Sequence, residues 1–184
     1  MSKSVWVVLG VVVVLALLLI SGYNSMVSLN ENVDSKWSQV ENQLQRRADL
    51  IPNLVNTVKG YAAHEQEIFT DLANARAQMM QAGTVGQAAE ADQAMGSALS
   101  RLFAIAENYP TLKADANFRQ LQDELAGTEN RIATSRKDYN DAVQGFNTKI
   151  KRFPANIYAG MFGFEAREYF EAEPGSRTVP NVQF

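Results

Sequence analysis

Residues 5–20 read VWVVLGVVVVLALLLI, and every residue in this stretch except Gly10 is apolar. With residues 21–23 the stretch reaches the roughly 18–20 residues that a helix needs to cross a hydrocarbon core. It is longer than the apolar region of a cleaved signal peptide, about 7–15 residues, and no Ala-x-Ala cleavage site follows it. We therefore predict an uncleaved transmembrane anchor in residues 1–23. The anchor residues with the clearest membrane character, including an aromatic ring near each end, are Val5, Trp6, Leu15, Leu18, Ile20 and Tyr23.

The charges that flank the anchor favour one orientation by a small margin. Lys3 precedes the apolar stretch, and Glu31, Asp34 and Lys36 are the first charged residues after it. Lys and Arg accumulate on the cytoplasmic side of a membrane. Lys3 is close to the apolar stretch, and two acids come before Lys36 on the other side, so the sequence leans towards a cytoplasmic N-terminus and an extracytoplasmic domain. The margin is small because each side has one lysine.

After the anchor, apolar residues recur every three or four positions, which predicts α-helices. Pro52 lacks a backbone donor, so a kink or a break falls near residues 49–52, and the unbroken apolar stripe favours a kink. Two shorter helices are expected over residues 62–81 and 87–108, and a long last helix with heptad-like spacing over residues 118–153. The stripe on the first helix consists of Val33, Trp37, Val40, Leu44, Ile51, Leu54, Val58 and Tyr61.

These helices predict an all-α fold. Residues 24–153 are expected to form one domain, an up-and-down four-helix bundle with long antiparallel helices that follows the transmembrane helix. Residues 154–184 are rich in aromatic residues, glycine and proline and have no sustained period. We predict that they form an irregular, mostly extended tail docked on the bundle or on the membrane surface.

Composition excludes several function classes. The 17 basic and 20 acidic residues give a net charge of −3, whereas a domain that binds nucleic acid usually has an excess of basic residues. The charge therefore argues against nucleic-acid binding. Without cysteine and with the single histidine His64, the chain cannot build a thiolate site or a site that needs two imidazoles. Ile68 stands where a His-Glu-x-x-His zinc motif would need its second histidine, and neither a phosphate-binding loop nor a Gly-x-Ser-x-Gly turn is present. We predict a protein that is not an enzyme and uses no cofactor or metal.

Charged residues of alternating sign lie beside Pro52 and on the last helix, a pattern that allows pairing between helices. Two interpretations remain open: a buried polar cluster that fixes the register of the helices, or a ligand or partner site at the kink. The residues of this predicted cluster are Arg46, Arg47, Asp49, Glu129, Arg131, Arg136 and Asp138.

The end of the last helix combines cations with aromatic residues. An even number of antiparallel helices returns the chain to the bilayer, where such a pairing suits anionic headgroups. The alternative is that the aromatic rings close the end of the bundle. The predicted surface residues are Lys149, Lys151, Arg152, Phe153, Tyr158, Phe162 and Phe164.

The C-terminus carries a second candidate motif. Val182 and Phe184 end the chain as a hydrophobic-x-hydrophobic carboxylate, the form that PDZ-type grooves capture by strand addition. The alternative is that residues 179–184 pack back on the bundle.

A long set of residues after the anchor occurs in a characteristic order. It consists of Tyr23-Asn24, WSQVENQLQRRADLIPNLV at residues 37–55, KGYAAHE at residues 59–65, and Glu107-Asn108-Tyr109-Pro110, Leu121, Glu129-Asn130-Arg131-Ile132, Arg136, Asp138-Tyr139-Asn140, Phe153-Pro154, Gly163-Phe164 and Tyr169-Phe170. This set resembles the signature of the LemA family, and the resemblance spans nearly all of the chain after the anchor.

The resemblance implies a single-pass protein of the bacterial cell (inner) membrane with a bromodomain-like four-helix bundle and no established enzymatic activity. Some relatives are tied to remodelling of internal membranes, and others are encoded beside a membrane zinc metalloprotease. Topology predictions for the family often place the short N-terminus outside, opposite to the lean given by the flanking charges. Two functions are therefore carried forward: a homo-oligomeric scaffold that self-associates through coiled-coil-like helices and organises or remodels the bilayer, or an adaptor for a membrane protease or envelope quality-control complex.

Overall fold

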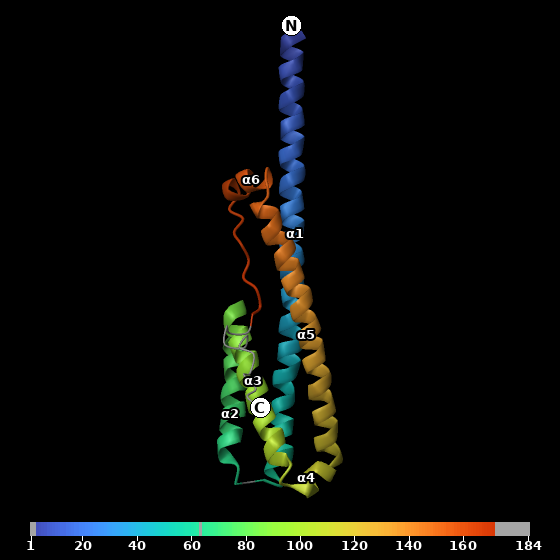
Figure 1. Cartoon of the computed structure of the whole chain (residues 1–184), viewed down its shortest axis with the longest axis vertical. Coiled ribbons are helices and arrows are strands. Elements are labelled where there is room, and N and C mark those ends of the chain that lie inside the picture. Colours follow the sequence, from blue (N-terminus) through green and yellow to red (C-terminus); the bar gives the residue numbers. More distant parts are fainter. Residues whose placement is uncertain (1–2, 63, 172–184) are drawn as a thin grey trace, which may run out of the picture. The chain divides into compact units, whose positions relative to one another are not determined.

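The computed structural model describes residues 3–62 and 64–171, and the regular elements in these residues are α-helices (Figure 1). This confirms the predicted all-α fold with a long apolar helix at its N-terminus. The helices are α1 (Lys3–Lys59), α2 (Gln66–Gln81), α3 (Val85–Ala106), α4 (Pro110–Ala114), α5 (Ala116–Lys151) and α6 (Ala155–Met161).

Contacts within the chain divide it into two compact units, and both α1 and α5 contribute to each of them. The stalk unit contains residues 3–38 and 138–168, and the bundle unit contains described residues from 39 to 137 together with 169–171. The sequence predicts a boundary near Tyr23, between an anchor and one bundle. In the structure the apolar segment shares a unit with the end of α5 and with α6, because those elements pack on the same helix.

The bundle unit has a core formed by apolar side chains of α1, α2, α3, α4 and α5. On α2 the buried residues are Ile68, Phe69, Leu72, Ala75 and Met79. α2 begins at Gln66, four residues later than the sequence predicted. Thr84 caps α3, since its hydroxyl oxygen accepts a hydrogen bond of 3.2 Å from the backbone N–H of Gln87. The remaining large core side chains are Val40, Leu44, Ile51, Leu54, Val58, Met95, Leu99, Leu102, Leu112, Phe118, Leu125 and Ile132.

α1 passes through Pro52 without a break, so the alternative of two separate helices is wrong. Proline has no N–H to donate to the carbonyl oxygen of Ala48, four residues earlier. That oxygen accepts a hydrogen bond of 3.0 Å from Nε of Arg76 on α2. A side chain from the neighbouring helix thus replaces the missing backbone donor, and the stripe stays buried on both sides of the proline.

This replacement predicts an energetic coupling between Arg76 and Pro52. Arg76→Met should lower the free energy of unfolding by about 1–3 kcal/mol, because it leaves the carbonyl of Ala48 without a donor. In a Pro52→Ala background the loss should be much smaller, because position 52 then supplies an N–H. Denaturant unfolding of the full chain in detergent micelles, followed by circular dichroism, measures both. Arg119→Met, at an exposed site on α5, is the control, and equal losses in the two backgrounds would contradict the coupling.

The stalk unit contains the apolar segment, and that segment is exposed. An 18-residue window of α1 has a mean hydropathy of 2.6, none of the window is buried, and the helix is long and apolar enough to cross a membrane. Trp6 is 61% exposed and Leu18 63% exposed. Leu15, Ile20 and Tyr23 are exposed as well, and Val5 lies within the helix. So large an unpartnered apolar surface indicates contact with lipid or with another protein.

Beyond Tyr23, α1 has partners within the stalk unit. Ala155, Tyr158 and Ala159 on α6 are buried there, so the segment expected to be mostly extended begins with a short helix. Residues 162–171 follow without a helix or a strand. The other large core side chains of this unit are Met26, Val33, Tyr139, Val143, Phe146 and Ile150.

Candidate functional site

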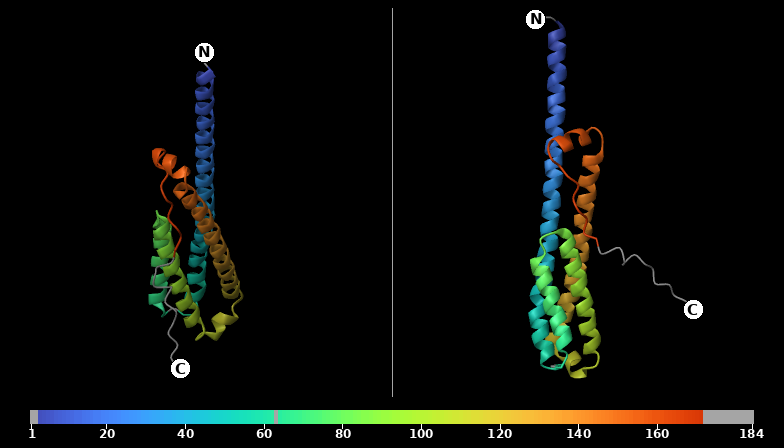
Figure 2. Two further views of the ribbon diagram at one scale, coloured as in Figure 1. Left: turned by 45° about the horizontal axis from the view of Figure 1, so that its top comes forward. Right: turned by 90° about the vertical axis from the view of Figure 1, so that its left-hand side faces the viewer.

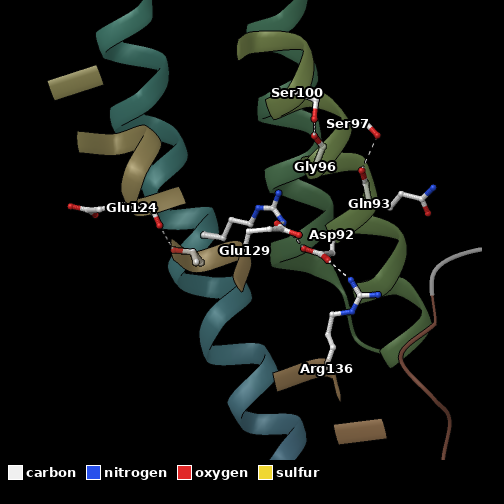
Figure 3. Close-up of polar contacts among 10 residues, drawn as sticks. Asp92, Gln93, Gly96, Ser97, Ser100, Glu124, Glu129 and Arg136 are labelled. Atoms are coloured by element: carbon white, nitrogen blue, oxygen red, sulfur yellow. Dashed lines mark hydrogen bonds and ion pairs between the residues drawn. The ribbon is translucent and has the colours of Figure 1, made fainter. Parts of the chain in front are cut away.

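The bundle unit buries a guanidinium among its apolar side chains. Arg47 on α1 is only 5% exposed, and its Nη1 lies 2.8 Å from Oδ1 of Asp92 on α3 and 2.8 Å from Oε2 of Glu129 on α5. Asp92 is also 5% exposed, and its second oxygen lies 3.4 Å from Nη1 of Arg136 (Figure 3). Three helices of the unit therefore meet in one network of two cations and two anions, the buried charge cluster. Arg47 and Asp92 at its centre are buried, whereas the side chains of Glu129 and Arg136 are 54% and 29% exposed.

Burial has the largest effect on the pKa of Asp92. Loss of water contact raises the pKa of Asp92 above its usual value; Arg47 and Arg136 act to lower it, and the nearby charge of Glu129 acts to raise it. Arg47 has one buried nitrogen, Nε, without a hydrogen-bond partner among the described residues. A buried charge is tolerated only when it is paired, so the cluster restricts which register of α1, α3 and α5 can form.

The structure brings together three of the seven residues predicted for this cluster: Arg47, Glu129 and Arg136. The other four lie elsewhere, because adjacent positions on a helix point to different sides. Arg46 and Arg131 line an open surface pocket of about 700 Å³. Asp49 accepts a hydrogen bond from the side chain of Gln45, and Asp138 pairs with Lys36 in the stalk unit.

Asp92 is the member of the cluster that the sequence analysis missed. A signal was available, because Asp92 is a single acid within the buried stripe of α3, which is otherwise small and apolar. The same kind of interruption marks Arg47 in the stripe of α1. Two opposite charges that interrupt two apolar stripes would have indicated a buried pair.

The buried charge cluster predicts a large effect of removing its central cation. Arg47→Leu should lower the free energy of unfolding by about 3–5 kcal/mol, because Asp92 stays buried with its closest cation gone. The double variant Arg47→Leu/Asp92→Leu should recover part of this loss. Arg46→Leu, at the exposed neighbouring position, should change stability by less than about 0.5 kcal/mol. Denaturant unfolding in micelles measures all three, and equal effects of Arg47→Leu and Arg46→Leu would show that the pairing contributes nothing.

A second group of polar contacts, in the stalk unit, joins the segment that follows α6 to α5 and α1. The side-chain amide of Asn147, which is 6% exposed, donates to the carbonyl of Arg167 at 2.9 Å and accepts from the N–H of Arg167 at 2.8 Å. The guanidinium of Arg167 forms an ion pair with Asp34 and donates to the side chain of Asn30. The hydroxyl of Tyr139 donates to the carbonyl of Glu168 at 2.8 Å. Residues 164–168, the strap, thereby connect α5 to α1 within this unit.

The strap predicts that Asn147 stabilises the stalk unit. Asn147→Leu removes both amide hydrogen bonds and leaves the backbone of Arg167 unpaired, so the unfolding free energy should fall by about 1–3 kcal/mol. Gln144→Leu, an equivalent change at an exposed position of α5, is the matched control. Hydrogen exchange of the full chain in micelles, read at residues 164–168, should show faster exchange in the first variant alone. Unchanged protection in Asn147→Leu would contradict the assignment.

The predicted surface residues at the end of α5 separate into two groups. Tyr158 is buried, and a Cβ added at Gly22 would lie 2.7 Å from Cζ of its ring. Phe164 is partly buried, and its ring centroid lies 5.8 Å from that of Tyr23. Lys149 is partly buried, and the exposed residues are Lys151, Arg152, Phe153 and Phe162. Val182 and Phe184, the candidate tail motif, lie outside the described residues.

The described residues contain no group of three or more His, Cys, Asp or Glu side chains that could hold a metal ion. His64 is exposed in the turn before α2. In the buried charge cluster polar groups pair between helices, and in the strap they join α5 and α1 to a segment without regular structure.

An exposed apolar helix joined to packed helices of this kind defines a membrane-associated helical protein. The sequence model of the LemA family matches residues 36–184, and the chain belongs to the LemA family. Magnetosome proteins MamQ 1 and MamQ 2 of Paramagnetospirillum magneticum are each 34% identical to it over 197 aligned residues, covering 93% of this chain and 72% of each relative. Magnetosome protein MamQ of Magnetospirillum gryphiswaldense is 31% identical, covering 87% of this chain and 68% of the relative.

Proposed function

We propose that the protein is a non-enzymatic, membrane-anchored helical scaffold that self-associates and organises or remodels the bilayer. The observation that carries the proposal is the continuity of α1. One helix, from Lys3 to Lys59, contains both the exposed apolar segment and side chains that are fully buried in the core of the bundle unit, such as Leu54. The apolar segment is therefore joined to the folded domain by the same helix, without an intervening loop.

The pattern of buried groups supports a structural role. In the described part of the chain, the buried side chains of Arg47 and Asn147 pair with Asp92 and with the backbone of Arg167, and these contacts join helices or connecting segments. Their positions favour a rigid domain with a fixed helix register. The relatives named as magnetosome proteins support a role at an organised bacterial assembly, and we carry that role to this chain as part of the proposal.

Self-association has to use surfaces other than the long apolar stripes. The stripe residues of α1 and α5, for example Val40, Leu54, Ile132 and Val143, are buried inside their own units. Surfaces that stay available include the apolar segment within the bilayer and the exposed polar faces of the helices. The proposed scaffold therefore assembles through these surfaces and not through a coiled coil of the buried stripes.

The proposal predicts contacts between copies in a membrane. A mixture of ¹⁵N-labelled and unlabelled full-length protein, reconstituted into liposomes and cross-linked through lysines such as Lys59 and Lys137, should give links that join the two isotopes. Electron microscopy of the same liposomes should show altered vesicle size or shape relative to protein-free liposomes. Monomers in unaltered vesicles would overturn the scaffold.

The same cross-linking in native membranes tests the adaptor alternative. Links from this chain mainly to one other membrane protein, with no mixed-isotope links, would favour an adaptor for a membrane protease or quality-control complex. Deleting residues 182–184 is the matched variant, because the candidate PDZ-type motif ends there. Loss of those links on deletion would show that the C-terminal tail binds the partner protein.

A further inference from the structure

We propose that α6 and the turn before it form a second membrane contact, an interfacial foot that inserts apolar side chains into the headgroup region of the same bilayer that the apolar segment spans. The inference rests on the membrane anchoring in the proposed function, but not on self-association. Its class of ligand is a bilayer surface with anionic headgroups.

The first step is the two-sided character of α6. Ala155, Tyr158 and Ala159 are buried on one side. The opposite side is exposed and apolar, with Ile157 58% and Met161 78% exposed. Four residues before Ile157, Phe153 is 80% exposed, and the same spacing separates Ile157 from Met161. This helix therefore turns apolar side chains outwards, the reverse of the pattern on a soluble domain.

The second step is the position of this face along α1. Tyr158 lies against Gly22, where an added Cβ would come within 2.8 Å of Cε2 of the ring. The rings of Tyr23 and Phe162 meet edge to face with their centroids 4.9 Å apart. Gly22 and Tyr23 directly follow the exposed apolar stretch, and Figures 1 and 2 show α1 extending alone beyond α6 on its N-terminal side. The apolar face of α6 thus lies where the spanning segment meets the water layer.

The third step is charge. Residues 149–164 contain three cations, Lys149, Lys151 and Arg152, and no acid. On α1 no charged residue occurs between Lys3 and Glu31, and on the strap the acids begin at Glu165. Cations beside exposed aromatic and aliphatic side chains match the boundary between anionic headgroups and acyl chains. A bilayer is the occupant that accounts for the charges, the apolar face and the adjoining span together.

The absence of cysteine from the sequence allows a direct test on the full-length protein. Single variants Phe153→Cys and Met161→Cys are labelled with an environment-sensitive fluorophore and reconstituted into vesicles of phosphatidylcholine and phosphatidylglycerol. Brominated lipids should quench both labels about twofold or more strongly than the control Gln144→Cys, an exposed polar position on α5. Leu15→Cys, labelled in the same way, is the positive control because it lies in the apolar segment proposed to span the bilayer.

Each outcome separates this inference from the proposed function. If lipid quenches the label at Leu15→Cys but quenches Phe153→Cys and Met161→Cys no more than the control, the foot is overturned and the anchor is left intact. If lipid does not quench a label at position 161, and unlabelled Met161→Cys forms disulfides between copies, the foot is overturned in favour of a contact between two chains. Absence of quenching at Leu15→Cys contradicts both the anchor and the foot.

The headgroup contact has its own variant. Lys151→Gln/Arg152→Gln should reduce quenching of the label at position 161 in vesicles that contain phosphatidylglycerol and change it little in phosphatidylcholine alone. The same variant with the label at Leu15→Cys is the control, because the span does not depend on those cations. An equal signal with and without the two cations in phosphatidylglycerol would contradict the headgroup contact.

Discussion

The buried charge of Arg47 is the constraint on which the packing of the bundle unit depends. A guanidinium that is 5% exposed has lost its water, and only the carboxylates of Asp92 and Glu129, each at 2.8 Å, compensate for that loss. Apolar side chains tolerate a slip of one helix along another, since one methyl contact can replace another. The paired charges do not, so they hold α1, α3 and α5 in one register.

The second constraint is that buried backbone N–H and C=O groups need hydrogen-bond partners. Again, side chains on a neighbouring helix supply them. Pro52 would leave the carbonyl of Ala48 unpaired, and Nε of Arg76 donates to that oxygen. In the stalk unit, the amide of Asn147 pairs with both backbone polar groups of Arg167. In both units a long side chain or an amide replaces hydrogen bonds that the local chain lacks. This is how α1 stays continuous and how the strap, without a helix or a strand, is fixed to its unit.

The proposed function follows from where apolar surface is buried and where it is not. The stripes of the long helices are buried within the chain, so they stabilise each unit internally. Among the described residues, the N-terminal part of α1 and the outer face of α6 around Met161 are exposed apolar surfaces. Because Tyr158 packs on Gly22, these two surfaces adjoin within the stalk unit. In the proposed arrangement a bilayer contacts both surfaces at once, so the membrane would take part in the packing of this unit.

The sequence by itself determined the all-α class, the apolar span, and the buried face of α2, because helical periodicity and hydrophobic length are local properties that read directly from residue order. It also singled out Arg47. It did not determine the partner Asp92, the donor Arg76 at Pro52, or the division into units, because each depends on which faces of distant helices meet. The pairing of Asn147 with Arg167 has no periodic signal at all. Only tertiary packing decided these contacts, since residues far apart in the chain become neighbours only after the helices have associated.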